Sequence, residues 1–450
     1  METSKNGKAK RIELFNLKSI NMRVFHLTWM AFFLCFFGWF GIAPMLAIVR
    51  EDLGITTDQI VNTNMIAVAS TVFMRLIIGW LCDRIGPRVT YTWLLILGSI
   101  PVILIGMVQN YEQFLLARMF IGAIGAGFVI TQFHTSVMFA PNIVGTANAT
   151  TAGWGNLGGG VTQQVMPIIF AGALAYTGSE FLAWRLSMIG PGIMLFVMGI
   201  VYYYFTQDTP KGNYNYLDTK KKEKKSKDNI SKVLGDYKVW LLFIIYGACF
   251  GVELIVNSKA ALYFIDYFDM DIKTAGLIAG LFGLMNLFAR SLGGFFGDRF
   301  GKTGGLNGRV RWLFITLFVE SLALILFSRM GTIPLIIASL LLFSLFVQMS
   351  EGATYSVVPF VNKKALGMVS GIVGAGGNAG AVAGMLLFKK NLTGLEWTDS
   401  FFVLGFIVMA VSFSTFLIRF SKKAEVIARK ESRKEEELIQ LQPELATATS

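Results

Sequence analysis

Two copies of one charged motif are the residues best suited to do chemistry in this chain. The first copy contains Arg75, Gly79, Asp83, Arg84 and Gly86, and the second contains Arg290, Gly294, Asp298, Arg299 and Gly301. Both have the spacing R-x3-G-x3-D-R-x-G, and they lie 215 positions apart. Two helical turns, about 11–12 Å, separate the first arginine from the aspartate. The repeat predicts two arginines at equivalent depths in two related halves.

Both motif arginines lie in apolar stretches, and neither residues 65–82 nor residues 277–297 contain an acid at that depth. An arginine at the centre of a membrane span costs about 2.5–3.5 kcal/mol on insertion scales, so it is retained for a function. The guanidinium group is planar and donates in a fork, which suits a planar oxyanion. We therefore expect Arg75 and Arg290 to bind a small anion between the two halves.

Aromatic residues are candidates for the walls of the same site. Tyr246 and Phe250 are four residues apart, so they share one face of a helix. Phe128 and Phe133 lie in the apolar stretch at residues 112–138. Most of the 39 phenylalanines in the chain are expected to be packing residues. The four named aromatic residues are candidates only because they occur together in the same region as the arginines.

The elements that hold these residues are membrane-spanning helices. The chain has 450 residues, of which 54% are hydrophobic and 15% are charged, against about 25% charged in soluble proteins. A spanning helix needs about 20 mostly apolar residues. Such stretches predict an all-α membrane protein with twelve spans near residues 24–48, 59–81, 89–109, 112–138, 145–172, 184–206, 238–265, 272–297, 310–329, 332–359, 366–388 and 397–420.

The repeat divides these spans into two halves, residues 24–206 and 237–420, joined by a linker at 207–236. Lysine and arginine collect in the segments 1–23, 207–236 and 421–450, and in the loops after the second and eighth spans. The positive-inside rule then places both ends of the chain and the linker in the cytoplasm. The lysine run at 220–227 is interpreted as a topology signal, with binding of anionic lipid headgroups as the alternative.

The D-R-x-G loops resemble the cytoplasmic loop signature of the major facilitator superfamily. The run from Ala152 to Gly160 resembles the signature of the nitrate/nitrite porter family, and the run from Gly374 to Gly380 resembles its second copy. The runs Phe33 to Phe40 and Tyr246 to Leu254 are similar to further segments of that family. The resemblance extends from about residue 22 to residue 390 and is closest to the high-affinity nitrate transporter branch.

The resemblance implies a major facilitator fold of two pseudo-symmetric six-helix halves, and nitrate or nitrite as the transported anion. It implies that Arg75 and Arg290 clamp the anion, that Phe128, Tyr246 and Phe250 sandwich it, and that Asn156 and Asn378 lie nearby. Helices would slide past their neighbours at glycines, and charged loop residues would latch the gate. These are Gly153, Gly155, Gly158, Gly159, Gly376, Gly377 and Gly380, with Asp83, Arg84, Asp298 and Arg299.

Uptake of an anion into a negative cell opposes the membrane potential by about 2.3 kcal/mol per charge per 100 mV. Proton symport would overcome this, and it needs a titratable group near the anion. Glu253 is the first candidate, Glu351 the second and Glu320 the third. Lys259 lies within two turns of Glu253 and is a possible partner for that carboxylate.

Other functions remain open from the sequence. Exchange of nitrate for nitrite, transport of another small anion such as formate, and a nitrate sensor on a transporter fold are the alternatives. An enzyme is not expected, because there is no set of nucleophile and base and no nucleotide loop. We expect no cofactor, no metal, no nucleic acid partner and a monomer in the lipid bilayer of the plasma membrane, or of the inner membrane in a bacterium.

Overall fold

The chain is almost entirely helical. The computed structural model describes residues 3, 7–214, 231–270, 272–422 and 424–429. The first half contains α1 (Ile20–Phe40), α2 (Leu46–Leu53), α3 (Thr57–Ile85), α4 (Pro87–Leu104), α5 (Tyr111–Gly122), α6 (Gly127–Met138), α7 (Val144–Thr177), α8 (Glu180–Ser187) and α9 (Ile189–Phe205). The second half contains α11 (Tyr237–Phe268), α12 (Ile272–Leu284), α13 (Ala289–Ser328), α14 (Ile333–Val357), α15 (Leu366–Met385), α16 (Lys390–Thr393) and α17 (Trp397–Ser414).

Eleven stretches of the described residues are long and apolar enough to span a membrane. One of them, Leu277–Ser328, has 52 residues, about 78 Å of helix at 1.5 Å per residue. That is more than twice the hydrocarbon thickness of about 30 Å. Gly305 breaks α13 with a φ of +65°, and the rings of Phe300 and Trp312 on its two sides stack with centroids 5.2 Å apart. The stretch therefore crosses twice, which agrees with the twelve expected spans.

Local sequence explains where the helices begin and end. Thr56 and Gln59 form a capping box that starts α3, each side chain bonding the other's backbone N–H. Gly86, with a φ of +89°, ends α3, and Pro87 begins α4 without needing a backbone donor. These signals place the charged loop of the first motif directly at a helix end.

Two spans are interrupted beside residues expected at the anion site. The 3-10 turn η3 (Ala123–Ala126) separates α5 from α6, and η5 (Met285–Leu287) separates α12 from α13. A 3-10 stretch in the middle of a helix often marks a hinge, and broken helices line the central sites of transporters. Phe128 follows the first break and Arg290 follows the second.

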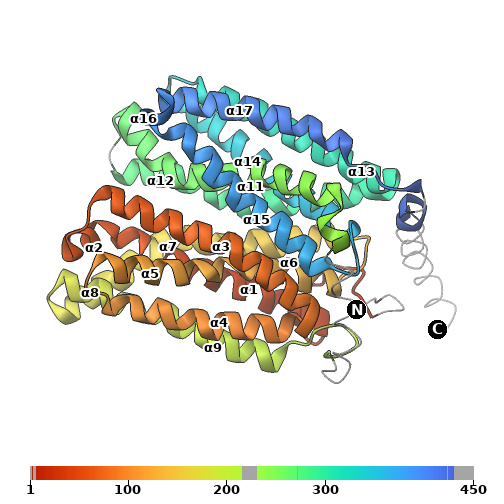
Figure 1. Ribbon diagram of the computed structural model, residues 1–450, viewed down its shortest axis with the longest axis horizontal. Coiled ribbons are helices and arrows are strands. Elements are labelled where there is room, and N and C mark those ends of the chain that lie inside the picture. Colours follow the sequence, from red (N-terminus) through yellow and green to blue (C-terminus); the bar gives the residue numbers. More distant parts are fainter. Residues whose placement is uncertain (1–2, 4–6, 215–230, 271, 423, 430–450) are drawn as a thin grey trace.

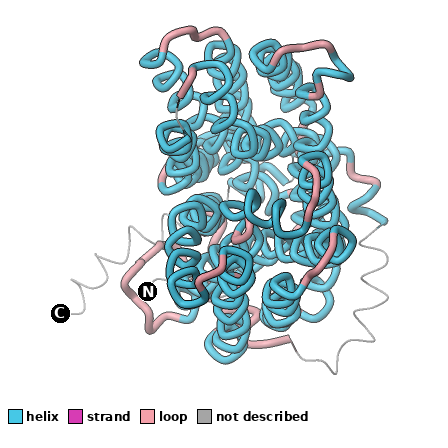
Figure 2. The backbone as a smooth tube through the Cα atoms, turned by 90° about the vertical axis from the view of Figure 1, so that its left-hand side faces the viewer, coloured by secondary structure: helices cyan, strands magenta, loops and turns pink. Residues whose placement is uncertain are grey.

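The two halves lie side by side, as Figure 1 shows, with α1 to α9 in one layer and α11 to α17 in the other. The start of α1 and the end of α17 lie at the same end of the helices, which we call the terminus side, and the short helices α2, α8, α12 and α16 lie at the opposite side. Seen from that opposite side in Figure 2, the helices form two groups viewed nearly end-on. The interface between the halves is therefore parallel to most of the spans.

The halves pack more tightly on the terminus side than on the opposite side. Every residue of α15 from Leu366 to Asn378 is buried. In α7, burial is concentrated between Val144 and Gly158, whereas Ile168 and Tyr176 further along are 71% and 88% exposed. Glycines allow the close approach: a Cβ on Gly371 would lie 2.7 Å from the backbone oxygen of Arg75. The molecule is therefore closed between its halves on the terminus side.

A segment before α1 covers part of this closed side. The backbone N–H of Ala9 donates to the Met138 carbonyl (2.9 Å), and that of Ala140 donates to the Ala9 carbonyl (2.9 Å). The Asn142 side chain donates to the Lys10 carbonyl (2.9 Å). The segment thus pairs with the loop between α6 and α7.

The lysine run at 220–227 and the tail from residue 430 lie outside the described residues. The interpretation of the lysine run as a topology signal, with lipid binding as the alternative, therefore stays a prediction.

Candidate anion-binding site

Arg75 projects from the middle of α3 and is fully buried. One of its nitrogens, Nη1, donates to the Gly374 carbonyl of α15 in the other half. Its Nε and Nη2 have no hydrogen-bond partner among the described residues. A buried guanidinium with unused donors is costly unless a ligand accepts from them. Arg75 therefore presents two donors and a positive charge to a guest.

Arg290 occupies the equivalent place in α13 and is 1% exposed. Its Nη1 pairs with the Glu351 carboxylate, and its Nη2 donates to the Tyr246 hydroxyl at 2.7 Å. The expectation that no acid neutralises this arginine is wrong. The acid comes from α14, outside the span at residues 277–297 that holds Arg290. Only Nε of Arg290 is without a partner within the described part of the chain.

Three aromatic rings are stacked next to the two arginines. Tyr246 and Phe250 stack with centroids 5.3 Å apart, and Phe128 from the other half lies 5.7 Å from Tyr246 and 6.2 Å from Phe250, with nearly parallel planes. The Arg75 guanidinium lies 5.0 Å from the Phe128 centroid and 5.4 Å from that of Phe250. For Arg290 the same distances are 5.5 and 6.0 Å. Each half therefore supplies one arginine and one side of the aromatic stack.

Tyr355 is a member of this site that the sequence analysis missed. Its ring meets Phe128 edge-on at 5.0 Å and Tyr246 at 5.1 Å, and its hydroxyl donates to the Ser370 carbonyl at 3.3 Å. It follows Glu351 by four residues on α14, so the two share a helix face. That spacing is the signal that could have found it. Phe133 is buried on α6.

The two asparagines of the glycine-rich runs lie deep in the protein. Asn156 on α7 is 7% exposed, and neither its amide nitrogen nor its amide oxygen has a hydrogen-bond partner within the described ranges. Asn378 on α15 is fully buried and donates weakly to the Val68 carbonyl at 3.4 Å. Buried amides without partners are rare, so Asn156 offers unused donors and acceptors at the interface.

Most of the expected glycines lie where a neighbour leaves no room for a side chain. A Cβ on Gly153 would lie 2.6 Å from the Asn286 carbonyl oxygen, and one on Gly377 would lie 2.5 Å from the Phe250 ring. Gly159 has more space, with its nearest neighbour a ring carbon of Phe36 at 3.3 Å. The others with close neighbours are Gly155 against Phe32, Gly158 against Phe33, Gly376 against Phe243 and Gly380 against Gly247.

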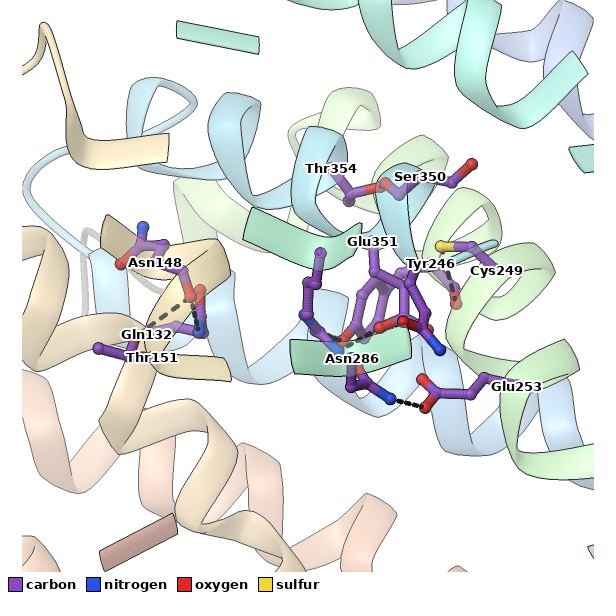
Figure 3. A network of polar contacts seen from close by, with 12 residues as sticks. Gln132, Asn148, Thr151, Tyr246, Cys249, Glu253, Asn286, Ser350, Glu351 and Thr354 are labelled. Atoms are coloured by element: carbon purple, nitrogen blue, oxygen red, sulfur yellow. Dashed lines mark hydrogen bonds and ion pairs between the residues drawn. The ribbon is translucent and has the colours of Figure 1, made fainter. Parts of the chain in front are cut away.

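Three buried carboxyls gather in the second half near Arg290. Glu253 on α11 is 2% exposed, and Glu320 and Glu351 are fully buried. Asn286 donates to Glu253 at 2.8 Å, as Figure 3 shows together with the neighbouring Glu351 and Tyr246. The suggestion that Lys259 pairs with Glu253 is wrong, because the Lys259 ammonium lies over the Trp397 ring, 4.7 Å from its centroid.

The two motif aspartates cap helices of opposite halves. Asp83, at the end of α3, accepts from the backbone N–H groups of Gly367 (3.1 Å) and Met368 (2.9 Å) at the start of α15. Asp298, on α13, accepts from Gly145 (3.1 Å) and Thr146 (2.6 Å) at the start of α7. A carboxylate at a helix start satisfies free N–H groups and meets the positive end of the dipole. Each aspartate therefore joins the halves on the terminus side.

The arginines that follow these aspartates have different surroundings from the aspartates. Arg84 lies over the Trp80 ring of its own helix, 5.0 Å from the centroid, and Arg299 is exposed. The cation beside Asp298 is instead Arg309, at 2.5 Å, which also donates to the Pro141 carbonyl of the other half at 2.9 Å. Nothing in the motif spacing pointed to Arg309.

Comparison with known proteins defines the class. The Major Facilitator Superfamily profile matches residues 28–307 and 257–447, which together span most of the chain. The chain therefore belongs to the Major Facilitator Superfamily.

Solved structures share the fold. The human organic anion transporter MFSD10 superposes with a TM-score of 0.66 at 14% identity, covering 88% of this chain and 99% of that one. The Escherichia coli fucose:proton symporter FucP gives 0.67 at 12% identity, covering 89% and 100%. The expected fold, all-α with two six-helix halves, is confirmed.

Relatives of known name are more similar in sequence. The high affinity nitrate transporter 2.5 of Arabidopsis thaliana is 37% identical over 432 residues, 95% of this chain and 86% of the relative. The nitrate/nitrite transporter NrtP of a Picosynechococcus strain is 31% identical, covering 80% of this chain and 83% of the relative. The resemblance of the glycine-rich runs thus extends over nearly the whole chain.

Proposed function

We propose that this protein imports nitrate, with nitrite as a second substrate, by proton-coupled alternating access. The observation that supports it most is the pair of buried arginines, one from each half, next to the stacked rings of Phe128, Tyr246 and Phe250. The names of the relatives supply the choice of nitrate among planar anions.

Nitrate fits the chemistry of these residues. It is flat and carries one charge over three oxygens, so it accepts in-plane hydrogen bonds while its faces pack against rings. The free Nε and Nη2 of Arg75 would donate to two oxygens as a fork. Phe128 lies in one half and Phe250 in the other. The anion would therefore contact both halves at once, and both contacts would be lost when it dissociates.

Coupling to protons would pass through Arg290. In the empty protein its partner is Glu351. An anion that binds Arg290 competes with this carboxylate, and a buried carboxylate that loses its cation takes up a proton. Anion binding and proton uptake would thus favour each other.

We place the terminus side in the cytoplasm, on the positive-inside rule. The closed conformation would then be one in which the Asp83 and Asp298 caps hold the cytoplasmic gate shut. The caps must break for the anion to leave inward. The broken helices at η3 and η5 are the expected hinges.

The test is uptake of labelled nitrate by the purified protein in liposomes, with an inward proton gradient or with nitrite inside. Accumulation that follows the gradient supports symport, and it should be absent with the Arg75→Lys protein. Uptake that requires internal nitrite and ignores the gradient would replace symport by exchange. No nitrate uptake under either condition would contradict the substrate assignment, and formate is then the anion to try next.

A further inference from the structure

Glu253 and Glu351 face each other from α11 and α14, each with one satisfied oxygen and one unsatisfied oxygen. Glu253 Oε1 accepts from the Asn286 amide at 2.8 Å, and Glu351 Oε2 accepts from Arg290. The remaining oxygens, Glu253 Oε2 and Glu351 Oε1, receive no hydrogen bond from any described residue. Figure 3 shows the Glu253 and Glu351 side chains as neighbours, and a side-chain interaction links their two carboxyl groups.

Two carboxylates in contact inside a protein cannot both be ionised, because their charges repel strongly where water is absent. A protonated carboxyl, however, is a donor. One proton shared between the two carboxyl groups would give both of them a hydrogen bond. The same contact without a proton would leave two buried acceptors facing each other at a high energetic cost.

The charges around the pair also favour one bound proton. Among the described residues, the cation paired with it is Arg290 from α13. The other titratable neighbours on the packed helices are Tyr246 and Cys249 on α11, Glu320 on α13 and Tyr355 on α14. Asn286, at η5, is neutral. A pair with one proton carries a single negative charge, which Arg290 balances.

Glu320 is separate from this arrangement. Its nearest polar neighbour is Ser350, whose hydroxyl donates to the Phe346 carbonyl at 2.8 Å. Neither Glu320 oxygen receives a hydrogen bond within the described residues. A neutral Glu320 could donate a hydrogen bond to the Ser350 oxygen. Glu320 is buried and forms no ion pair within the described residues, so it serves as a matched control.

We infer that Glu253 and Glu351 form one proton-binding site, in which a single proton is shared between the two carboxyls when no anion is bound. This inference rests on the proposed function for its role in transport. When an anion takes Arg290, the pair loses its cation and accepts a second proton from water at Glu351. Release of the anion returns Arg290 to Glu351 and that proton leaves. The coupling group is therefore the pair and not either residue alone.

Infrared spectroscopy of the purified protein, without substrate, tests the shared proton directly. The stretching band of a protonated carboxyl should be present at neutral pH. It should disappear in both Glu253→Gln and Glu351→Gln, because either change leaves one carboxylate with an amide donor. Glu320→Gln should leave this band in place and remove only its own. Loss of the band in Glu253→Gln alone would mean an ordinary neutral Glu253 and would overturn the inference.

Nitrate binding at different pH values gives the second readout. Glu253→Gln has the same charge as the half-protonated pair, so its nitrate affinity near neutral pH should stay within about twofold of wild type. Binding takes up one proton at Glu351 in both proteins, so both affinities should fall as pH rises. At alkaline pH the wild-type pair has lost its shared proton and binding must take up two protons, so the wild-type affinity should fall more steeply with pH, whereas Glu253→Gln should keep the one-proton slope. A higher affinity of Glu253→Gln at every pH would mean that both carboxyls are ionised and would refute the pair. If wild type binds no nitrate while the infrared result holds, the substrate assignment fails and the pair stands.

Discussion

Arg75 and Arg290 hold equivalent positions in the two halves but differ in their partners. Arg75 donates to a neutral carbonyl and keeps two free donors, while Arg290 is bound to Glu351 and Tyr246. The aspartates repeat the contrast, since Asp298 has Arg309 beside it, whereas Asp83 accepts from two backbone N–H groups and pairs with no cation among the described residues. Both halves thus contain the arginine and the aspartate of the repeat. The buried glutamates near Arg290 come from the second half. One half is suited to bind the anion and the other to respond to it.

The largest effect that would test this contrast is expected from Arg75→Lys. Lysine keeps the charge but loses the planar fork, and hydrogen bonds to charged groups contribute about 1.5–3 kcal/mol each. We expect nitrate affinity to fall at least about tenfold in a calorimetric titration. Arg118→Lys is the matched control, because Arg118 is also buried but donates to Trp39 and Asn64. Equal losses in both proteins would mean that the effect is on folding.

Glu351→Gln would remove the contrast by giving Arg290 a neutral neighbour. Accumulation of nitrate driven by a proton gradient should be abolished, while exchange of nitrate across liposomes at equal concentrations should continue. The reason is that the variant still binds the anion but has no acid that competes for Arg290. Flux assays under the two conditions measure this. Full gradient-driven accumulation by the variant would remove Glu351 from the coupling.

The two gate aspartates should differ in a smaller, graded way. Asp298→Asn weakens the contacts to Gly145 and Thr146 and leaves Arg309 without its carboxylate, whereas Asp83→Asn affects two backbone donors. We expect the melting temperature in detergent to fall further for Asp298→Asn, because this variant also loses a charged hydrogen bond, which contributes about 1.5–3 kcal/mol to the free energy of unfolding. A larger drop for Asp83→Asn would reverse the ranking of the two caps.

The smallest effect is expected at Gly159. Its counterpart in the second copy of the run, three residues after Asn378, is Ala381, so Gly159→Ala makes the halves more alike. Its added Cβ meets only the Phe36 ring at 3.3 Å, which can shift. Nitrate uptake should stay within about twofold of wild type. A severe loss would show that the first half needs this glycine for movement.

The sequence was sufficient for the features that depend on local pattern. The spans follow from apolar length, and the repeat placed both arginines and both aspartates at helix positions that the structure shares. The partners were not predictable in the same way. Glu351 lies 61 residues from Arg290 and meets it through the packing of α14 on α13. Tyr355 was one of 13 tyrosines, and Arg309 was one basic residue among several in its loop.

The reciprocal caps have a consequence for the origin of the molecule. Asp83 of the first half caps α15 of the second, and Asp298 of the second caps α7 of the first. Such mutual exchange is the geometry of a two-fold symmetric dimer, in which the same patch serves on both sides. A single six-helix ancestor bearing both the aspartate and the helix start would have closed the same gate with a second copy of itself. The two halves of the present chain keep the contact geometry of such a symmetric pair.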